Sequence, residues 1–296
     1  MEESVALSCC ADFYSRNWHP IWNSGIFAGD RMMTVARFGL MDDADIELDV
    51  AALELSELDH PGTDLSPYVA VLQHIADRVA IVGMAAQAPE EQAAALATVI
   101  HEELGFVGDA ESYDAPLNAD FIRVIDRRKG LPVSLSILYV AAARRMDWVA
   151  FALNTPGHVL VRIGKEEAVI IDPFNGGRIM SSEGLTALLQ RMLGDATPAE
   201  QHVAPMSNRS ILMRLLLNQS QRAEQAGDHH RARKIYERAV LVAPDHPDAW
   251  WQLARLQLQE SDVDAARHSL SSMLEVTRDP ERRELAAAAL DAMAPR

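Results

Sequence analysis

Residues 127–177 decide the fold of this chain and read RRKGLPVSLSILYVAAARRMDWVAFALNTPGHVLVRIGKEEAVIIDPFNGG. Gly130 ends one helix, and Pro132 suits the first turn of the next, whose apolar residues recur at helical spacing through residue 146. Three short apolar runs bounded by turn residues follow, as is typical of buried strands. They cover residues 149–153, 159–163 and 168–171. The stretch therefore predicts one helix packed on a small antiparallel sheet.

His158 and Asp172 fall on successive strands of that sheet. This layout resembles a papain-like or transglutaminase-like core, in which a thiol at the helix N-terminus meets a histidine on the next strand and an acid on the one after. The histidine activates the nucleophile and the acid orients the histidine. The expected place of the thiol, two residues after Gly130, holds Pro132. We predict an α+β, mostly helical fold and no confident catalytic residue.

Ser134 and Ser136 are the nearby hydroxyls that could replace the thiol. The pKa of a serine hydroxyl is too high for the helix end alone to ionise it, so a base must touch it. Helix geometry rotates Ser134 by about 200° and Ser136 by about 400° from residue 132, and places Ser136 about 6 Å deeper. We therefore expect neither hydroxyl to reach His158.

Other polar residues are predicted to line the same cleft. Tyr113 and Asn118 lie in the loop ahead of the central helix, and Asn175 follows Asp172. With His158 and Asp172 they form the predicted ligand-binding set. The histidines show no zinc-ligand spacing, so neither a metal nor a cofactor is predicted.

The chain before this core is predicted to be helical from residue 45 onward. Three amphipathic segments begin near Ile46, Ser66 and Pro89, with Ser66 as the cap of the second helix. Together with the core they make a predicted transglutaminase-like domain over residues 45–195. Residues 1–44 mix aromatic residues with Gly, Pro and Asp, show neither helical nor strand periodicity clearly, and stay unassigned.

Residues 196–296 are predicted to form tetratricopeptide-like helical hairpins. Small and large residues recur at the positions of the 34-residue pattern. They are Gly227, Ala232, Tyr236, Ala239 and Pro244, followed by Trp250, Leu253, Ala254, Ala266, Leu270 and Met273. Each hairpin must stack on a neighbour to bury its apolar face. Because two units are fewer than the usual three, we expect helices near 181–192 and 281–293 to cover their ends.

Composition narrows the class of partner. The chain has 43 acidic and 27 basic residues and a net charge of −16, which argues against nucleic acid or an anionic membrane. We predict a protein or peptide partner, bound through the repeats, the cleft or both; the composition specifies no oligomeric state. Adjacent Cys9 and Cys10 cannot readily form a disulfide with each other, and we find no signal peptide or membrane span, so a cytoplasmic location is expected.

Several motifs in order resemble the bacterial SirB family, over roughly residues 45–290. They are Tyr113-x2-Pro116-x-Asn118, Arg128-x-Gly130-x-Pro132-x-Ser134-Leu135-Ser136, Pro156-Gly157-His158 and Asp172-Pro173-Phe174-Asn175-Gly176-Gly177. The resemblance implies a transglutaminase-like core that lacks the active cysteine, followed by tetratricopeptide repeats. Asp147 departs from the family, which usually has glycine at this helix end.

These observations favour a non-catalytic, cytoplasmic protein that binds a ligand or a protein partner and uses its repeats for protein contact. One alternative is a hydrolase or acyltransferase that uses Ser134 or Ser136 with His158 and Asp172. Another is a structural adaptor that acts through its repeats only.

Overall fold

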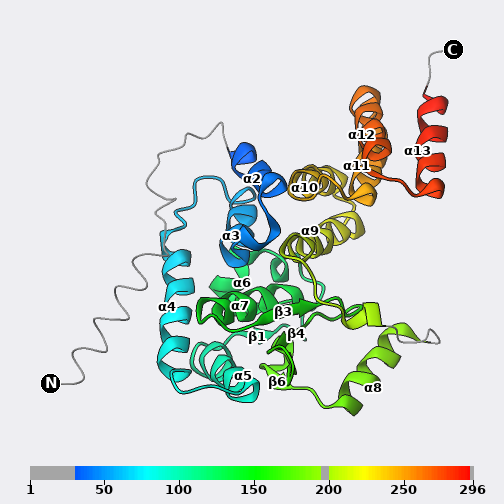
Figure 1. Ribbon diagram of the computed structural model, residues 1–296. Coiled ribbons are helices and arrows are strands. Elements are labelled where there is room, and N and C mark those ends of the chain that lie inside the picture. The colour runs from blue at the N-terminus through cyan, green and yellow to red at the C-terminus, as the bar shows by residue number, and fades with distance from the viewer. Residues whose placement is uncertain (1–30, 195–199, 294–296) are drawn as a thin grey trace.

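The computed structural model describes residues 31–194 and 200–293 (Figure 1). Its helices are α2 (Arg31–Leu40), α3 (Leu48–Glu57), α4 (Ser66–Val82), α5 (Pro89–Ala97), α6 (Phe121–Arg127), α7 (Pro132–Arg145), α8 (Ser182–Leu193), α9 (Asn208–Gln225), α10 (His229–Val242), α11 (Pro247–Gln259), α12 (Val263–Val276) and α13 (Pro280–Ala292). A π-helical turn, Thr98–Glu103, continues α5. The predicted α+β, mostly helical class is confirmed.

The sheet is antiparallel, with strand order β3-β4-β5-β6. Its strands are β3 (Ala150–Leu153), β4 (Leu160–Ile163), β5 (Val169–Asp172) and β6 (Arg178–Ile179). The first three agree with the predicted runs, whereas the short β6 was not predicted. A separate parallel pair joins β1 (Val107–Gly108) to β2 (Lys129–Gly130). Strand β1 lies in a segment predicted as a loop, and β2 ends at the glycine before α7.

The two faces of the sheet pack against different helices. Val161 and Ile163 of β4 belong to the main core, and α7 packs against both β3 and β4. On the opposite face, Leu160 packs with Leu188 of α8 in a smaller cluster. Alternation of inward and outward side chains along each strand produces this division. The Ser181 hydroxyl caps α8 by accepting a hydrogen bond from the Gly184 N–H.

The helices before the core form the predicted layer around α7, with one difference at a boundary. Helix α4 begins at Ser66 itself, and the Asp64 carboxylate accepts the Ser66 N–H at 2.9 Å. Ser66 is therefore inside the helix rather than its cap. Helix α2 lies within the segment that the sequence left unassigned, and it packs against α10 of the repeats. Cys9 and Cys10 lie outside the described residues.

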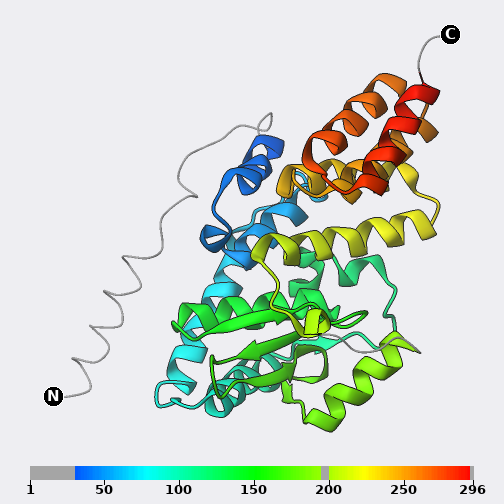
Figure 2. The same ribbon diagram turned by 45° about the vertical axis from the view of Figure 1, so that its right-hand side comes forward.

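Helix α9 lies between the core and the remaining repeat helices, as Figures 1 and 2 both show. Helices α9 to α13 follow the helical-hairpin order of the predicted repeats. The main hydrophobic cluster continues from the core into α9, α10 and α11, while Ala254, Ala266 and Ala286 belong to a separate cluster at the C-terminal end. The predicted domain boundary at 195/196 stays a prediction. No helix in the described part of the chain is long and apolar enough to cross a membrane.

Three described residues other than glycine, Arg128, Asp147 and Ser261, adopt the left-handed conformation at helix ends, and the last two are compared with glycine here. Asp147 has φ +57°, and its N–H and that of Trp148 donate to Arg144 O and Ala143 O in a Schellman cap. Ser261 has φ +63°, one 34-residue period after Gly227 at φ +75°. The matched conformation supports the predicted repeat register.

Replacing either residue with glycine is expected to stabilise the protein. Asp147→Gly and Ser261→Gly should each raise the free energy of unfolding by about 1 kcal/mol, because a side chain in this conformation is strained. Gly227→Ala is the matched reverse change, since no atom lies within 4 Å of the added Cβ and only backbone strain is introduced. It should lose a similar amount. Urea denaturation of the three variants measures the effects; a loss of stability in Ser261→Gly would contradict the assignment.

Candidate functional site

His158 and Asp172 meet at the end of the sheet beside α7. Asp172 ends β5, and His158 lies two residues before β4, in a turn where Gly157 adopts φ +65°. The His158 Nε2 atom lies 2.8 Å from Asp172 Oδ1. The two residues are 8% and 4% exposed, so their hydrogen bond is largely shielded from water. The expected meeting of the histidine and the acid is therefore present.

The Asp172 carboxylate is saturated with donors. Oδ1 accepts the N–H of Phe174 at 3.0 Å and of Asn175 at 3.3 Å, besides the His158 contact, and Oδ2 accepts Asn175 Nδ2 at 2.7 Å. Burial raises the pKa of this carboxyl. The hydrogen bond and charge interaction with His158 lower it, as do the hydrogen bonds from Asn175, and the pKa lies below its ordinary value. Asp172 therefore orients His158 and also shapes its own turn.

The serine hydroxyls are engaged elsewhere. Ser134 Oγ donates to Asn118 O at 2.8 Å, and Ser136 Oγ to Val159 O at 3.4 Å. Both serines are fully buried. Among the described residues, no hydroxyl makes a hydrogen bond with the His158 ring, whose hydrogen-bond partner is Asp172. Ser136 thus bonds to the carbonyl of Val159, the residue that follows His158 in the chain.

Aromatic side chains cover the pair. The Phe174 ring makes edge contacts with the rings of His158 and Tyr113, with centroids 5.7 Å apart in each case. The Tyr113 hydroxyl donates to Gly157 O at 3.3 Å and so bridges two loops above the site. Burial raises the pKa of Tyr113. Tyr113 is 37% exposed and Asn175 is exposed, so these two predicted residues present side chains at the surface.

Asn118 has a different position from the one expected. It is fully buried, its amide N–H groups donate to Ser112 O and Tyr113 O, and its Oδ1 accepts from Arg127 at 2.8 Å. Its side chain thus lies beneath the loop of Tyr113 rather than at a surface open to a ligand. Asn118 was expected to line the cleft. The structure instead has it supporting the loop, because its amide already has backbone and arginine partners.

Two arginines of α9, which sequence reasoning missed, hold both loops of the site. Arg214 donates to Thr155 O at 2.6 Å and to Asn154 Oδ1 at 3.1 Å, in the turn that leads to His158. Arg222 donates to Tyr113 O at 3.3 Å and lies over the Tyr113 ring. Burial lowers the pKa of Arg214. No local signal marks these residues, because they come from a helix far along the chain.

Tyr139 of α7 lies under the turn that follows Asp172. Its hydroxyl is buried without a hydrogen-bond partner among the described residues, and a Cβ added at Gly177 would lie 2.8 Å from it. Burial, and then the negative charge of Asp172, raise its pKa strongly. The phenol therefore stays neutral and fills the space below the turn, which only glycine at 177 can approach so closely.

Comparison with known families identifies the core. The family model of the transglutaminase-like superfamily matches residues 66–217, which include every residue of the site described above except Arg222. The chain belongs to the transglutaminase-like superfamily. A tetratricopeptide repeat model matches residues 223–289 of this transglutaminase-like protein. The boundary between the two matched regions falls within α9, the helix that holds the site loops.

Similar proteins include two bacterial ones named UPF0162. A UPF0162 protein of Xylella fastidiosa (strain 9a5c) is 26% identical over 262 residues, which is 87% of this chain and 89% of the relative. UPF0162 protein PA3419 of Pseudomonas aeruginosa is 29% identical over 179 residues, 60% of this chain and 66% of the relative. Human F-box only protein 21 is 34% identical over 89 residues, covering 27% of this chain and 14% of that protein. Membership of the narrower SirB family stays a prediction.

Proposed function

We propose that this transglutaminase-like protein is a non-catalytic binding protein of the SirB family, acting in the cytoplasm. One observation carries the proposal: the two serines that could replace the missing thiol are buried and donate to backbone carbonyls, while the His158 ring is bonded to Asp172. A histidine and an acid without a nucleophile cannot form a covalent acyl intermediate. The tetratricopeptide repeats support contact with a protein partner.

The proposed ligand surface is small and lies over the covered pair. Tyr113 and Asn175 present it, and His158 with Asp172 lies directly beneath. Because Arg214 and Arg222 tie both loops of the site to α9, a partner that moves α9 would also move this surface. We therefore propose that ligand binding at the core and partner binding at the repeats influence each other through α9.

The rival enzyme would use Ser136 in preference to Ser134. Its hydrogen bond to Val159 O is long at 3.4 Å, and Val159 is the neighbour of His158 in the chain. A shift of this turn would have to bring the imidazole to the hydroxyl before any proton transfer. A structural adaptor that acts through its repeats alone makes no use of the site.

An assay of purified full-length protein distinguishes these functions. We expect no turnover of glutaminyl, peptide or ester substrates above background, and the same background rate in His158→Ala and Ser136→Ala. The serine variant removes the candidate nucleophile and leaves His158 and Asp172 in place. Reproducible turnover that is lost in both variants would establish the enzyme and reject the binding protein.

A further inference from the structure

Two arginines of α9 hold the loops of the candidate site without an equal number of closely paired carboxylates. Arg214 donates to Asn154 Oδ1 at 3.1 Å and to Thr155 O at 2.6 Å, and both acceptors are neutral. Among the described residues no carboxylate forms an ion pair with it. Arg222 has Asp114 at 3.6 Å, but that aspartate side chain is 86% exposed, and a solvated ion pair contributes little. One positive charge is therefore left unmatched beside the site loops.

Burial makes this positive charge unfavourable. Arg214 is half-buried, and burial lowers the pKa of its guanidinium. An arginine keeps its proton throughout the usual pH range, so the desolvated charge stays in place. Arg222 is 7% exposed, and its Nε atom is buried without a hydrogen-bond partner in the described part of the chain. A negative charge brought by a ligand would offset the desolvation of both guanidinium groups.

Both guanidinium groups act on one side chain of the proposed ligand surface, Tyr113. The guanidinium carbon of Arg222 lies 5.9 Å from the centre of the Tyr113 ring. Burial raises the pKa of the Tyr113 phenol, and the positive charges of Arg222 and Arg214 act in the opposite direction. The phenol also donates to Gly157 O, in the same turn that Arg214 holds. The unmatched charge therefore lies beside the exposed edge of Tyr113.

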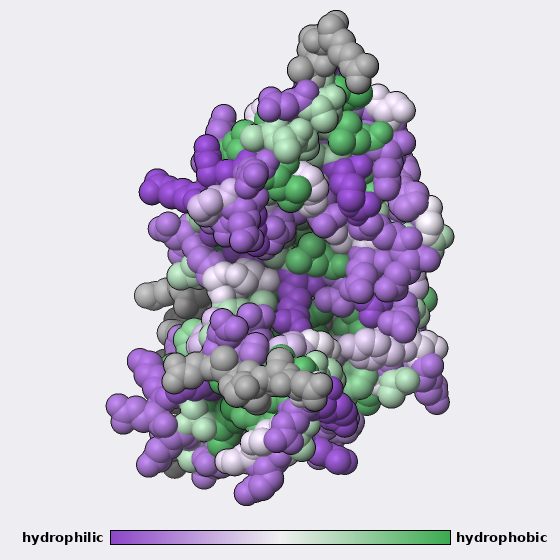
Figure 3. All heavy atoms as spheres, turned by 90° about the vertical axis from the view of Figure 1, so that its right-hand side faces the viewer, coloured by the Kyte–Doolittle hydropathy of each residue, from purple (hydrophilic) through white to green (hydrophobic). Residues whose placement is uncertain are grey.

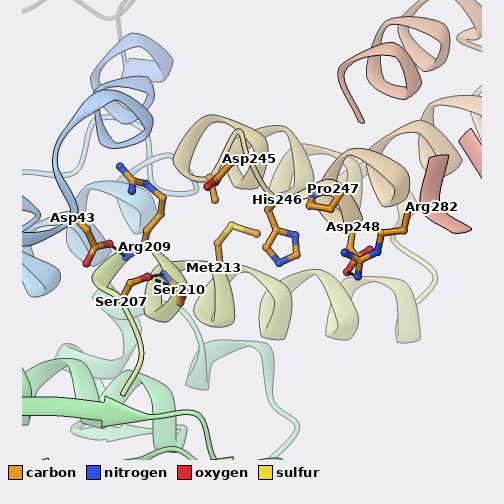
Figure 4. A pocket seen from close by; sticks show the side chains of 11 residues that line it. Asp43, Ser207, Arg209, Ser210, Met213, Asp245, His246, Pro247, Asp248 and Arg282 are labelled. Carbon is orange, nitrogen blue, oxygen red and sulfur yellow. Dashed lines mark hydrogen bonds and ion pairs between the residues drawn. The ribbon is translucent and has the colours of Figure 1, made fainter. Parts of the chain in front are cut away.

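Two other arginines near the start of α9 differ in this respect. In a cavity of about 460 Å³ where α9 and α11 begin, Arg282 forms an ion pair with Asp248 at 2.8 Å (Figure 4). Arg209 of the same cavity donates to Phe38 O and Met41 O at the C-terminal end of α2, where the helix dipole favours a positive charge. Both charges are compensated within the chain, unlike that of the arginine at the site loops.

An exposed amide beside Arg214 adds a neutral donor. Asn154 accepts from Arg214 through Oδ1, so its Nδ2 group remains available as a donor, and Arg214 itself uses two of the five N–H groups of a guanidinium. A carboxylate binds through its two oxygens to such paired N–H donors. We propose that Arg214 and Asn154, with Arg222 beside them, bind a carboxylate of the ligand next to Tyr113. The inference rests on the proposed ligand-binding function and names the class of ligand, a monoanion that matches the one unmatched charge.

A matched pair of small ligands tests the proposal. N-acetylglycine carries a carboxylate, and N-acetylglycine amide has nearly the same shape without the charge. Titration of N-acetylglycine into the isotope-labelled full-length protein at constant ionic strength should shift the NMR signals of the Asn154 side-chain amide and the Arg214 Nε–H group. The shifts should saturate with a Kd on the order of 1–10 mM, and the amide should produce none. No saturation below about 100 mM, or equal shifts with the amide, would overturn the proposal.

Exposed substitutions separate ligand binding from support of the loops. Asn154→Asp supplies the missing carboxylate to Arg214 and keeps the loop attached, so it should weaken N-acetylglycine binding at least about tenfold and raise the melting temperature. Asp114→Asn removes the carboxylate that competes for Arg222 and should strengthen binding about threefold. Arg282→Gln is the matched control and should leave the affinity unchanged, because this arginine already has Asp248 as its partner.

The variants can also contradict the proposal. Unchanged affinity or a lower melting temperature in Asn154→Asp would show that the charge of Arg214 is already matched, and weaker binding in Asp114→Asn would reject a carboxylate site beside Arg222. These outcomes are distinct from those of the turnover assay. Turnover that is lost in His158→Ala would reject the proposed function even if N-acetylglycine binds, whereas absence of carboxylate selectivity would reject only this class of ligand.

Discussion

A chain that ends at residue 210 is expected to aggregate rather than fold. The deletion removes Ile211, Leu212, Leu215 and Leu216, which are at most 1% exposed and belong to the same hydrophobic cluster as the core. Burial of each such side chain contributes about 1.5–3 kcal/mol. The free energy of unfolding of a domain is usually about 5–15 kcal/mol. Loss of these four buried side chains would remove much of it.

Polar contacts strengthen this expectation. The Gln219 amide donates to Ala119 O at 2.7 Å, and Arg238 of α10 donates to Asp59 at 2.7 Å, so the deletion also leaves polar groups of the core without partners. Size-exclusion chromatography and thermal unfolding measure the outcome. The control is deletion of residues 280–296, which removes α13 from the smaller C-terminal cluster and should leave a folded monomer. A monomeric 1–210 chain with an unchanged melting temperature would show the repeats to be an independent module.

Asp172→Ala is expected to have the largest effect of any single substitution in the site. The change leaves His158, two backbone N–H groups and the Asn175 amide without their acceptor. A buried polar group that loses its hydrogen-bond partner costs about 1–3 kcal/mol. Chemical denaturation measures it, with Asp114→Ala as control because that side chain is 86% exposed. A loss within about 1 kcal/mol of the control would mean that the turn holds without Asp172.

The same carboxylate predicts a pH dependence. Its pKa is lowered in the folded protein from an ordinary value of 3.8, so the unfolded chain takes up the proton at a higher pH than the folded one. The contribution of the ionised Asp172 carboxylate to the free energy of unfolding is fully present above about pH 4 and is lost as the pH falls through the folded-state pKa. Wild-type stability should therefore decline more steeply with acid than that of Asp172→Asn. Parallel declines would contradict this source of acid sensitivity.

The surface of the molecule is consistent with a role in binding. Figure 3 shows hydrophobic side chains within a hollow between the repeats above and the core below, surrounded by hydrophilic ones. Helix α9 spans this boundary and carries Arg214 and Arg222, which hold the His158 and Tyr113 loops.

The sequence by itself determined the elements and the meeting of His158 with Asp172. Glycine, proline and apolar periodicity act over a few residues, and they mark α7, three strands and the 34-residue repeats without any distant contact. The histidine and the acid lie near neighbouring strands joined by a short hairpin, so their approach follows from local connectivity. The helical rotation of Ser134 away from the site follows from the same local geometry.

Only the tertiary structure decided what surrounds that pair. Phe174 covers His158, Asn118 supports the Tyr113 loop from beneath, and α9 supplies Arg214 and Arg222 from about 60 and 110 residues away in the chain. Such contacts depend on how whole helices pack, and packing is set by the summed burial of many side chains rather than by any local pattern. For the same reason the hydrogen-bond partner of Ser136 could be found only in the folded chain.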